Sequence, residues 1–263
     1  MHDNIIVAEN LGFSIPVFQP AERKINRNPL RLMTDFYSNQ SERNMRSLIS
    51  DVNFKLKYGQ RLGVMGGNGG GKTTLLRLLT GVYAHNNGTL MINGSTHGLF
   101  DFQMGILPDA TGVENIYLRG LQMGLSLRNI KEVIPEVLEF AGVGSAINDL
   151  FGTYSTGMKL RLATAISTMI SPDILIMDEW VGSGDENFKK KLDARMRRIV
   201  DDSKALIIAS HSARVIRDLC SHVLVIERGK SIFVGTVEDG IEAYLESMSK
   251  LKFEDKSKND IYV

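Results

Sequence analysis

The chain has 263 residues, of which 43% are hydrophobic and 23% charged, and its 31 Lys and Arg against 30 Asp and Glu leave a net charge of +1. This balance is typical of a folded globular protein with one large or two small domains, and it excludes the overall basic character of many nucleic-acid binders. A lone cysteine, Cys220, excludes an internal disulfide and a cysteine-rich metal centre. The first residues lack the order of a secretory leader, and no apolar run reaches the ~20 residues that span a bilayer, so we expect a cytoplasmic chain.

The N-terminal elements are predicted to be strands. Residues 5–8 form a short apolar run, and residues 51–56 alternate strictly between polar and apolar side chains. Such alternation indicates a strand with one buried face, which here carries Val52, Phe54 and Leu56.

Residues 19–47 interrupt this pattern and are predicted to be an insertion. The part from 21 to 47 carries six Lys or Arg against three Asp or Glu. Asn28 and Pro29 suit the start of a helix, and apolar side chains then recur at helical spacing. We therefore expect a short amphipathic helix whose apolar face carries Leu30, Leu32, Met33, Phe36 and Tyr37.

From residue 61 onward, short apolar runs alternate with helical patterns. Strands are predicted over residues 62–65, 89–92, 174–177, 206–209 and 223–226, and helices over 73–80 and 160–170. Short runs that are wholly apolar are typical of central strands covered on both faces, so the sequence predicts an α/β fold with a mostly parallel sheet. We expect one domain over residues 1–248, with a helical subdomain at about 103–170, followed by a charged tail over 249–263.

The strongest functional signal is a glycine-rich loop that fits the pattern G-x-x-x-x-G-K-[ST] between a predicted strand and a predicted helix. The loop consists of Gly66, Gly67, Asn68, Gly69, Gly70, Gly71, Lys72 and Thr73. Glycines let backbone amides approach phosphate oxygens without Cβ clashes, and the helix N-terminus adds a favourable partial charge. Lys72 is predicted to reach the β- and γ-phosphates, and Thr73 to offer its hydroxyl to Mg²⁺.

Two adjacent carboxylates, Asp178 and Glu179, follow the apolar run 174–177. Ligands of open α/β sheets bind at the carboxyl ends of the strands, which is where this pair is expected. Asp178 is predicted to hold Mg²⁺, directly or through water, and Glu179 to orient or deprotonate an attacking water. The alternative is a strand that simply ends at a polar turn, and the glycine loop argues against it.

Two further polar positions each have two interpretations. Ser155 is a good N-cap, so it either caps a core helix or joins the amide of Gly157 in an anion site at the helix start. His211 follows the apolar run 206–209. It is either a structural residue or a hydrogen-bond partner for a γ-phosphate on the same sheet edge as Glu179.

These motifs, in this order and spacing, resemble the ATP-binding subunits of ABC transporters over roughly residues 4–246. That family has a phosphate loop, a signature sequence at a helix start, an Asp-Glu strand end, an Asp-containing loop and a switch histidine. The signature Leu-Ser-Gly-Gly-Gln corresponds to residues 154–158, where Thr156 and Met158 depart from it, and the Asp-containing loop corresponds to 182–185. The resemblance implies a P-loop NTPase fold with an N-terminal antiparallel β part and a helical signature subdomain.

The resemblance also implies roles for individual residues. Catalytic roles fall on Glu179 and His211, and Mg²⁺ ligation falls on Thr73, Asp178 and Gln103. Contacts to ATP extend along the phosphate loop and include Thr74. Ser155 and Gly157 of a second chain would close on the γ-phosphate, so ATP would lie between two copies of the chain.

Two positions of the family pattern have competing candidates. The glutamine that the family places before the helical subdomain aligns with Gln103, but Asp101 aligns plausibly as well. The aromatic residue that stacks on adenine is assigned to Phe18, with Phe13 as the alternative.

Residues 107–117, 154–163 and 178–185 resemble a narrower group, the subunits that export bacterial polysaccharides such as O-antigen, capsule or teichoic acid. The resemblance implies an ATPase at the cytoplasmic face of the inner membrane that powers export of a lipid-linked polysaccharide. Its partners would be a second copy of the chain and a separate polytopic permease in two copies, with no direct binding of glycan or nucleic acid. The alternatives are a non-transport ABC ATPase of repair or translation, the ATPase of another ABC exporter, a P-loop kinase or GTPase, and a regulatory subunit without turnover.

Overall fold

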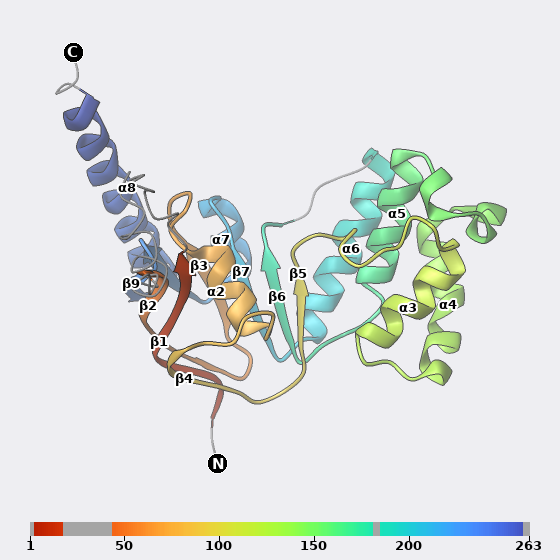
Figure 1. Cartoon of the computed structure of the whole chain (residues 1–263), viewed down its shortest axis with the longest axis horizontal. Helices are drawn as coiled ribbons and strands as arrows, with labels where there is room; N and C mark the ends of the chain where they lie inside the picture. Colours follow the sequence, from red (N-terminus) through yellow and green to blue (C-terminus); the bar gives the residue numbers. More distant parts are fainter. Residues whose placement is uncertain (1–2, 18–43, 181–184, 260–263) are drawn as a thin grey trace, which may run out of the picture.

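The computed structural model describes residues 3–17, 44–180 and 185–259 (Figure 1). Two sheets and a group of helices make up an α/β fold, as the alternation of apolar runs and helical patterns predicts. The predicted amphipathic helix at 28–37 and the candidate Phe18 lie outside the described residues.

The first sheet is antiparallel and has three strands in the order β2-β1-β4. Its strands are β1 (Asn4–Val17), β2 (Asn44–Lys57) and β4 (Asn87–Ile92). Val52, Phe54 and Leu56 of β2 are buried, which confirms the face predicted from their alternation.

Residues 44–47, which the sequence assigns to the insertion, instead begin β2. They pair with the far half of β1, where Asn44 lies opposite Val17 and Ser47 opposite Ser14. The ladder is held by backbone hydrogen bonds, so it continues through side chains that show no apolar alternation. For the same reason β1 is longer than the predicted strand at residues 5–8.

The second sheet has six strands in the order β5-β6-β7-β3-β8-β9. They are β5 (Thr96–Leu99), β6 (Ile174–Asp178), β7 (Ala205–Ala209), β3 (Arg61–Met65), β8 (His222–Glu227) and β9 (Lys230–Gly235). All neighbours pair in parallel except β8 and β9, which are antiparallel. The carboxyl ends of β3, β6 and β7 therefore meet at one edge.

Each central strand of this sheet contributes to two cores. Alternate residues such as Leu175 and Met177 face a core shared with the helices α3 to α6, whereas Ile174 and Ile176 face a core shared with α2 and the antiparallel sheet. Burial of both faces explains why these runs are apolar at every position.

The helices are α2 (Lys72–Leu79), α3 (Gly112–Gln122), α4 (Leu127–Ala141), α5 (Thr156–Ser167), α6 (Glu186–Asp202), α7 (Ala213–Leu219) and α8 (Val237–Asn259), with 3-10 turns η1 (Gly144–Asn148) and η2 (Phe151–Thr153). Helices α3, α4 and α5 lie together at one end of the molecule, and α8 projects from the other end (Figure 1).

One helix differs from its predicted extent, and another runs into the predicted C-terminal tail. The helix predicted over residues 160–170 begins at Thr156 and ends at Ser167, because Ser155 caps its first turn. Helix α8 continues to Asn259, well into the charged residues expected to form a tail. Within the described residues, no helix combines the length and the apolar character that a membrane span requires.

Candidate functional site

The glycine-rich loop connects β3 to α2 and curls closely against β8. A Cβ on Gly66 would lie 2.2 Å from the carbonyl oxygen of Ile226, a distance that excludes any side chain there. Gly71, the N-cap of α2, has φ 109°, which favours glycine. The loop thereby brings its backbone to the N-terminus of α2, where free N–H groups and the helix dipole attract anions.

The side chain of Lys72 folds back onto the start of this loop. Its Nζ donates to the carbonyl oxygens of Gly66 at 2.8 Å and Gly67 at 3.1 Å. The side chain is almost fully buried, and this burial lowers the pKa of its ammonium group, while the charges of Asp178 and Glu179 act in the opposite direction. A mostly dehydrated cation at a helix N-terminus is a strong site for phosphate oxygens.

Thr73 and Asp178 meet where α2 begins and β6 ends. The Thr73 hydroxyl donates to Asp178 Oδ2 at 2.6 Å, which joins two residues 105 positions apart. A hydroxyl and a carboxylate are hard oxygen donors of the kind that Mg²⁺ takes together with nucleotide phosphates and water. No cluster of three or more His, Cys, Asp or Glu suited to an all-protein metal site occurs among the described residues. Thr74 lies beside Thr73, half-buried in the first turn of α2, and its contact to ATP stays a prediction.

Glu179 is held in an unusual conformation directly after β6. Its backbone has φ 81°, in the left-handed region that non-glycine residues rarely adopt, and its N–H donates to Ala209 O at 2.9 Å. Both carboxylate oxygens are engaged. Ser210 Oγ donates to Oε2 at 2.8 Å, and the backbone N–H of His211 donates to Oε1 at 2.9 Å.

The sequence did not identify Ser210 as a site residue. It is fully buried at the end of β7 and its hydroxyl also accepts from the N–H of Ser212 at 3.1 Å. The position of Ser210, between the apolar run 206–209 and His211, indicates that it lies at the edge of a sheet. The sequence does not show which carboxylate its hydroxyl contacts.

Trp180 continues from Glu179 and is fixed by α6. Its Nε1 donates to Asp193 Oδ1 at 3.1 Å, and the guanidinium of Arg197 lies 5.7 Å from the ring centroid. Arg197 also pairs with Asp193 at 3.0 Å. The indole of Trp180, which directly follows Glu179, is therefore held in place by α6.

Ser155 and Gly157 lie at the start of α5, in the helical end of the molecule, whereas the phosphate loop precedes α2 beside the sheet (Figure 1). Ser155 Oγ accepts from the N–H of Met158 at 3.3 Å, so the capping interpretation describes its contact within one chain. Gly157 is exposed, and a Cβ there would meet nothing within 4 Å. The chain thus does not bring these two residues to its own phosphate loop.

The remaining candidates lie at the surface. Gln103 occupies an exposed turn between β5 and α3, where its backbone N–H donates to Asp101 Oδ1 at 2.9 Å. The metal and nucleotide roles given to Gln103 stay predictions. The ring of His211 is exposed, and its Nδ1 atom lies 3.4 Å from the hydroxyl oxygen of Tyr244 on α8.

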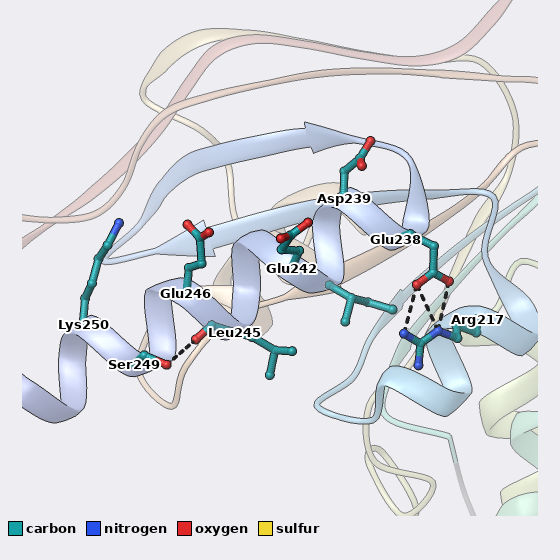
Figure 2. A pocket seen from close by; sticks show the side chains of 9 residues that line it. Arg217, Glu238, Asp239, Glu242, Leu245, Glu246, Ser249 and Lys250 are labelled. Atoms are coloured by element: carbon teal, nitrogen blue, oxygen red, sulfur yellow. Dashed lines mark hydrogen bonds and ion pairs between the residues drawn. The ribbon is translucent and has the colours of Figure 1, made fainter.

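A separate surface groove of about 620 Å³ runs along α8 (Figure 2). Four of its nine lining residues are acidic, namely Glu238, Asp239, Glu242 and Glu246, and Arg217 of α7 lies at one end, where it binds Glu238. The residues of the phosphate loop and the carboxylate pair do not line it. The groove is therefore separate from the candidate site.

Comparison with known proteins agrees with this geometry. A family model described as ABC transporter matches residues 49–182. The teichoic acids export ATP-binding protein TagH of Bacillus cereus is 34% identical over 238 residues, which is 89% of this chain and 43% of TagH. The O-antigen export system ATP-binding protein RfbE of Yersinia enterocolitica is 32% identical over 226 residues, which is 85% of this chain and 95% of RfbE. The chain thus spans less than half the length of TagH but nearly the whole of RfbE.

Solved structures show the same fold at low sequence identity. A dimer of the ATP-binding cassette MJ0796, in a post-hydrolysis state bound to ADP and Pi, matches with a TM-score of 0.63 and 17% identity, over 88% of this chain and 98% of that one. The protein cbiO1 of Clostridium perfringens, part of the ABC transporter complex cbiONQ, matches with a TM-score of 0.59 and 20% identity over 96% of both chains. With a phosphate loop, a paired threonine and aspartate, and two export ATP-binding relatives above 30% identity, this chain belongs to the ATP-binding proteins of the ABC transporter family.

Proposed function

We propose that this chain hydrolyses ATP to power export of a lipid-linked bacterial polysaccharide through a separate membrane permease. The observation that carries the ATPase assignment is the meeting of three groups at one sheet edge. These are the buried Lys72 ammonium, the Thr73–Asp178 pair and the Glu179 carboxylate fixed by two donors.

Each group has a task that its surroundings support. Lys72 and the N–H groups at the start of α2 would bind the phosphates of ATP. Thr73 and Asp178 would hold Mg²⁺, which when bound neutralises charge on the β- and γ-phosphate oxygens. Glu179 would orient and deprotonate the attacking water, because its carboxylate is aimed by Ser210 and by the backbone of His211.

A second copy of the chain would complete the site. Ser155 and Gly157 lie away from the phosphate loop of their own chain, and the open space around Gly157 leaves room for a phosphate group. A head-to-tail homodimer would place the start of α5 of one copy against the γ-phosphate held by the other. The Ser155 hydroxyl and the Gly157 N–H are hydrogen-bond donors at the start of a helix, a position that favours binding of an anion.

The export assignment rests on the relatives, which are named as teichoic acid and O-antigen export ATP-binding proteins. The ATPase would sit peripherally at the cytoplasmic face of the inner membrane, bound to two copies of a polytopic permease. We expect selectivity for the polymer to reside in the permease and the lipid carrier. We expect neither the free glycan nor nucleic acid to bind this chain.

Turnover of Mg-ATP by the purified full chain tests the ATPase assignment. Glu179→Gln keeps the size and hydrogen bonding of the side chain but removes the base. We expect kcat to fall by about 10²–10⁴-fold while ATP affinity is retained. Lys72→Ala should instead weaken ATP binding. Glu246→Gln, on the α8 groove, is the matched control and should keep full turnover. Wild-type turnover in Glu179→Gln would overturn the assigned base.

Export itself is tested with the permease. We expect the chain to co-purify with a co-expressed permease of a polysaccharide export system and to transport lipid-linked polymer in proteoliposomes only when ATP is hydrolysed. A chain that turns over ATP but neither co-purifies with the permease nor supports transport would favour a non-transport ATPase.

A further inference from the structure

His211 has two separate contacts, one through its backbone and one through its ring. The backbone N–H donates to the Glu179 carboxylate, which fixes the position of the residue between β7 and α7. The imidazole is exposed, and its hydrogen-bond partner among the described residues is the hydroxyl of Tyr244, 3.4 Å from Nδ1. Without that hydroxyl, the ring would be free to rotate between side-chain rotamers.

We propose that Tyr244 is a positioning residue for hydrolysis, whose hydroxyl donates to His211 Nδ1 and so holds the imidazole in the tautomer that carries its proton on Nε2. This inference rests on the proposed ATPase function. The choice of tautomer follows from the charge of the ligand. A phosphate oxygen accepts hydrogen bonds and donates none, so the ring must offer it an N–H. With Nδ1 occupied as an acceptor, Nε2–H is the donor that remains.

The opposite arrangement does not suit the site. If Nδ1–H donated to Tyr244, Nε2 would present a lone pair toward the phosphate side, and two acceptors would face each other. A tyrosine hydroxyl permits either arrangement, because it both donates and accepts. The arrangement with Tyr244 as donor is the one that leaves His211 able to bind a γ-phosphate.

Tyr244 can act in this way because α8 is firmly attached at this point. Figure 2 shows Arg217 of α7 forked onto Glu238, with Nε and Nη2 each donating at 2.9 Å. Ser247, less than one turn beyond Tyr244, donates to Glu227 Oε2 of β8. Between these anchors, a Cβ on Gly240 would lie 2.5 Å from Val223, so the helix approaches the sheet closely. The tyrosine ring packs against the core, which leaves its hydroxyl in a fixed place.

The tautomer is directly measurable in the full-length chain. Long-range ¹H–¹⁵N correlation spectra of ¹⁵N-histidine-labelled protein at about pH 8.5, where imidazoles are neutral, report which ring nitrogen is protonated. The chain has five histidines, and His211→Gln assigns the signal. We expect an unprotonated Nδ1 and a protonated Nε2 in the wild type. In Tyr244→Phe, which keeps the packed ring, both shifts should move toward those of a histidine free in solution.

Steady-state kinetics supply the second readout. Loss of one ordinary hydrogen bond should lower kcat of Tyr244→Phe by roughly 3- to 10-fold, with KM for ATP within about twofold. Ser249→Ala is the matched control, because it removes an exposed hydrogen bond within α8, to Leu245 O, that involves neither His211 nor the bonds that anchor the helix. It should keep both kcat and the histidine spectrum.

The outcomes separate this inference from the proposed function. A wild-type spectrum with Nδ1–H, or identical spectra in wild type and Tyr244→Phe, would overturn the role of Tyr244 even if the chain hydrolyses ATP. An equal loss of kcat in Ser249→Ala would also overturn it, since the effect would then come from a general disturbance of α8. If the wild type does not hydrolyse ATP, the proposed function fails, and the spectra still decide whether Tyr244 sets the tautomer.

Discussion

Glu179 illustrates at the level of one residue how the fold places a reactive group. Its left-handed backbone is unfavourable for a side chain with a Cβ, by roughly 1–3 kcal/mol. Three hydrogen bonds oppose that cost. One comes from its own N–H to Ala209, and two reach its carboxylate from Ser210 and His211. The carboxylate is therefore aimed by the end of the neighbouring strand β7.

Ser210→Ala tests this support. Removing the hydroxyl leaves Glu179 Oε2 without its donor, so the carboxylate gains freedom to rotate. We expect kcat for ATP hydrolysis to fall roughly 3- to 10-fold, less than in Glu179→Gln, with ATP affinity retained. Ser231→Ala removes a hydroxyl that bonds Asp51 O on the far side of the sheet and serves as the control. Equal rates in Ser210→Ala and wild type would show that the backbone contact of His211 suffices.

Gly66→Ala tests the shape of the phosphate loop. The added Cβ would meet the carbonyl oxygen of Ile226, a backbone atom that cannot move aside as a side chain can. We expect the loop to shift and ATP affinity, measured by calorimetry, to fall at least tenfold. Gly59→Ala controls for general destabilisation. Its φ of 77° also disfavours alanine, but open space surrounds it away from the loop. Tight ATP binding by Gly66→Ala would contradict the close approach to β8.

At the level of elements, the sequence predicts the strands whose side chains are buried, but it misses strand segments that form only because they pair with a neighbouring strand. The central strands β6, β7 and β8 are recognisable because both of their faces are buried, which makes residues 174–177, 205–209 and 223–226 apolar throughout. Strand β5, with the sequence Thr-His-Gly-Leu, has no such pattern, and its place at the sheet edge comes from pairing with β6. The sequence places residues 44–47 in the insertion for the same reason, because they too show no apolar alternation.

The site divides in a similar way. The phosphate loop and the pair Asp178 and Glu179 are local patterns whose chemistry fixes residue type and spacing, so the sequence reveals them. Ser210 and Tyr244 act on residues more than 30 positions away, across two strands or from a distant helix. A serine or tyrosine carries no local mark of such a contact, and only the tertiary fold brings the partners together.

Asp173 provides an element-scale prediction about stability. It precedes β6 and ties together the starts of β5 and β7. Its carboxylate accepts from Ser95 N–H at 2.8 Å and Ser95 Oγ at 3.0 Å, and it pairs with Lys204 at 2.7 Å. The Lys204 hydrogen bond and the two from Ser95 lower the pKa of Asp173 to about 2. The stabilisation is thus complete above the ordinary pKa of aspartate, near ~4, and is lost as the pH falls toward about 2.

Thermal unfolding of Asp173→Asn tests whether the stabilisation by Asp173 is lost as the pH falls. We expect a lower Tm than wild type at neutral pH, and a difference that shrinks as the pH falls from about 5 to about 2. Asp218→Asn, an exposed aspartate on α7, controls for the loss of a surface charge. A difference that stays constant over this range would mean that Asp173 stabilises the fold without its charge.

At the scale of the whole molecule, the complementary halves of the proposed ATP site lie in two separate parts of the fold. The phosphate loop and carboxylates lie at the sheet edge, and the start of α5 lies in the helical end (Figure 1). One chain cannot close the site on itself in this arrangement. Assembly and catalysis should therefore depend on each other.

The dimer prediction uses the hydrolysis-deficient Glu179→Gln chain. With Mg-ATP it should accumulate as a dimer in light scattering, because the intact γ-phosphate bridges Lys72 of one copy and Ser155 of the other. Adding Ser155→Arg should leave monomers, since a bulky cation replaces the hydroxyl at the anion site. Ser126→Arg, at the N-cap of α4, makes the same change at a different helix start and should leave the dimer intact. A dimer that persists with Ser155→Arg would refute the head-to-tail arrangement.

Trp180 has a practical consequence for studying this chain. It is the only tryptophan in the chain, it follows Glu179 directly, and its indole is bonded to Asp193 and covered by Arg197. Fluorescence excited at the red edge of the protein absorption spectrum therefore comes from a single residue, which lies next to Glu179. Stopped-flow fluorescence of the unlabelled chain should follow nucleotide binding, hydrolysis and release in real time, including in lipid vesicles where a permease without tryptophan adds no signal.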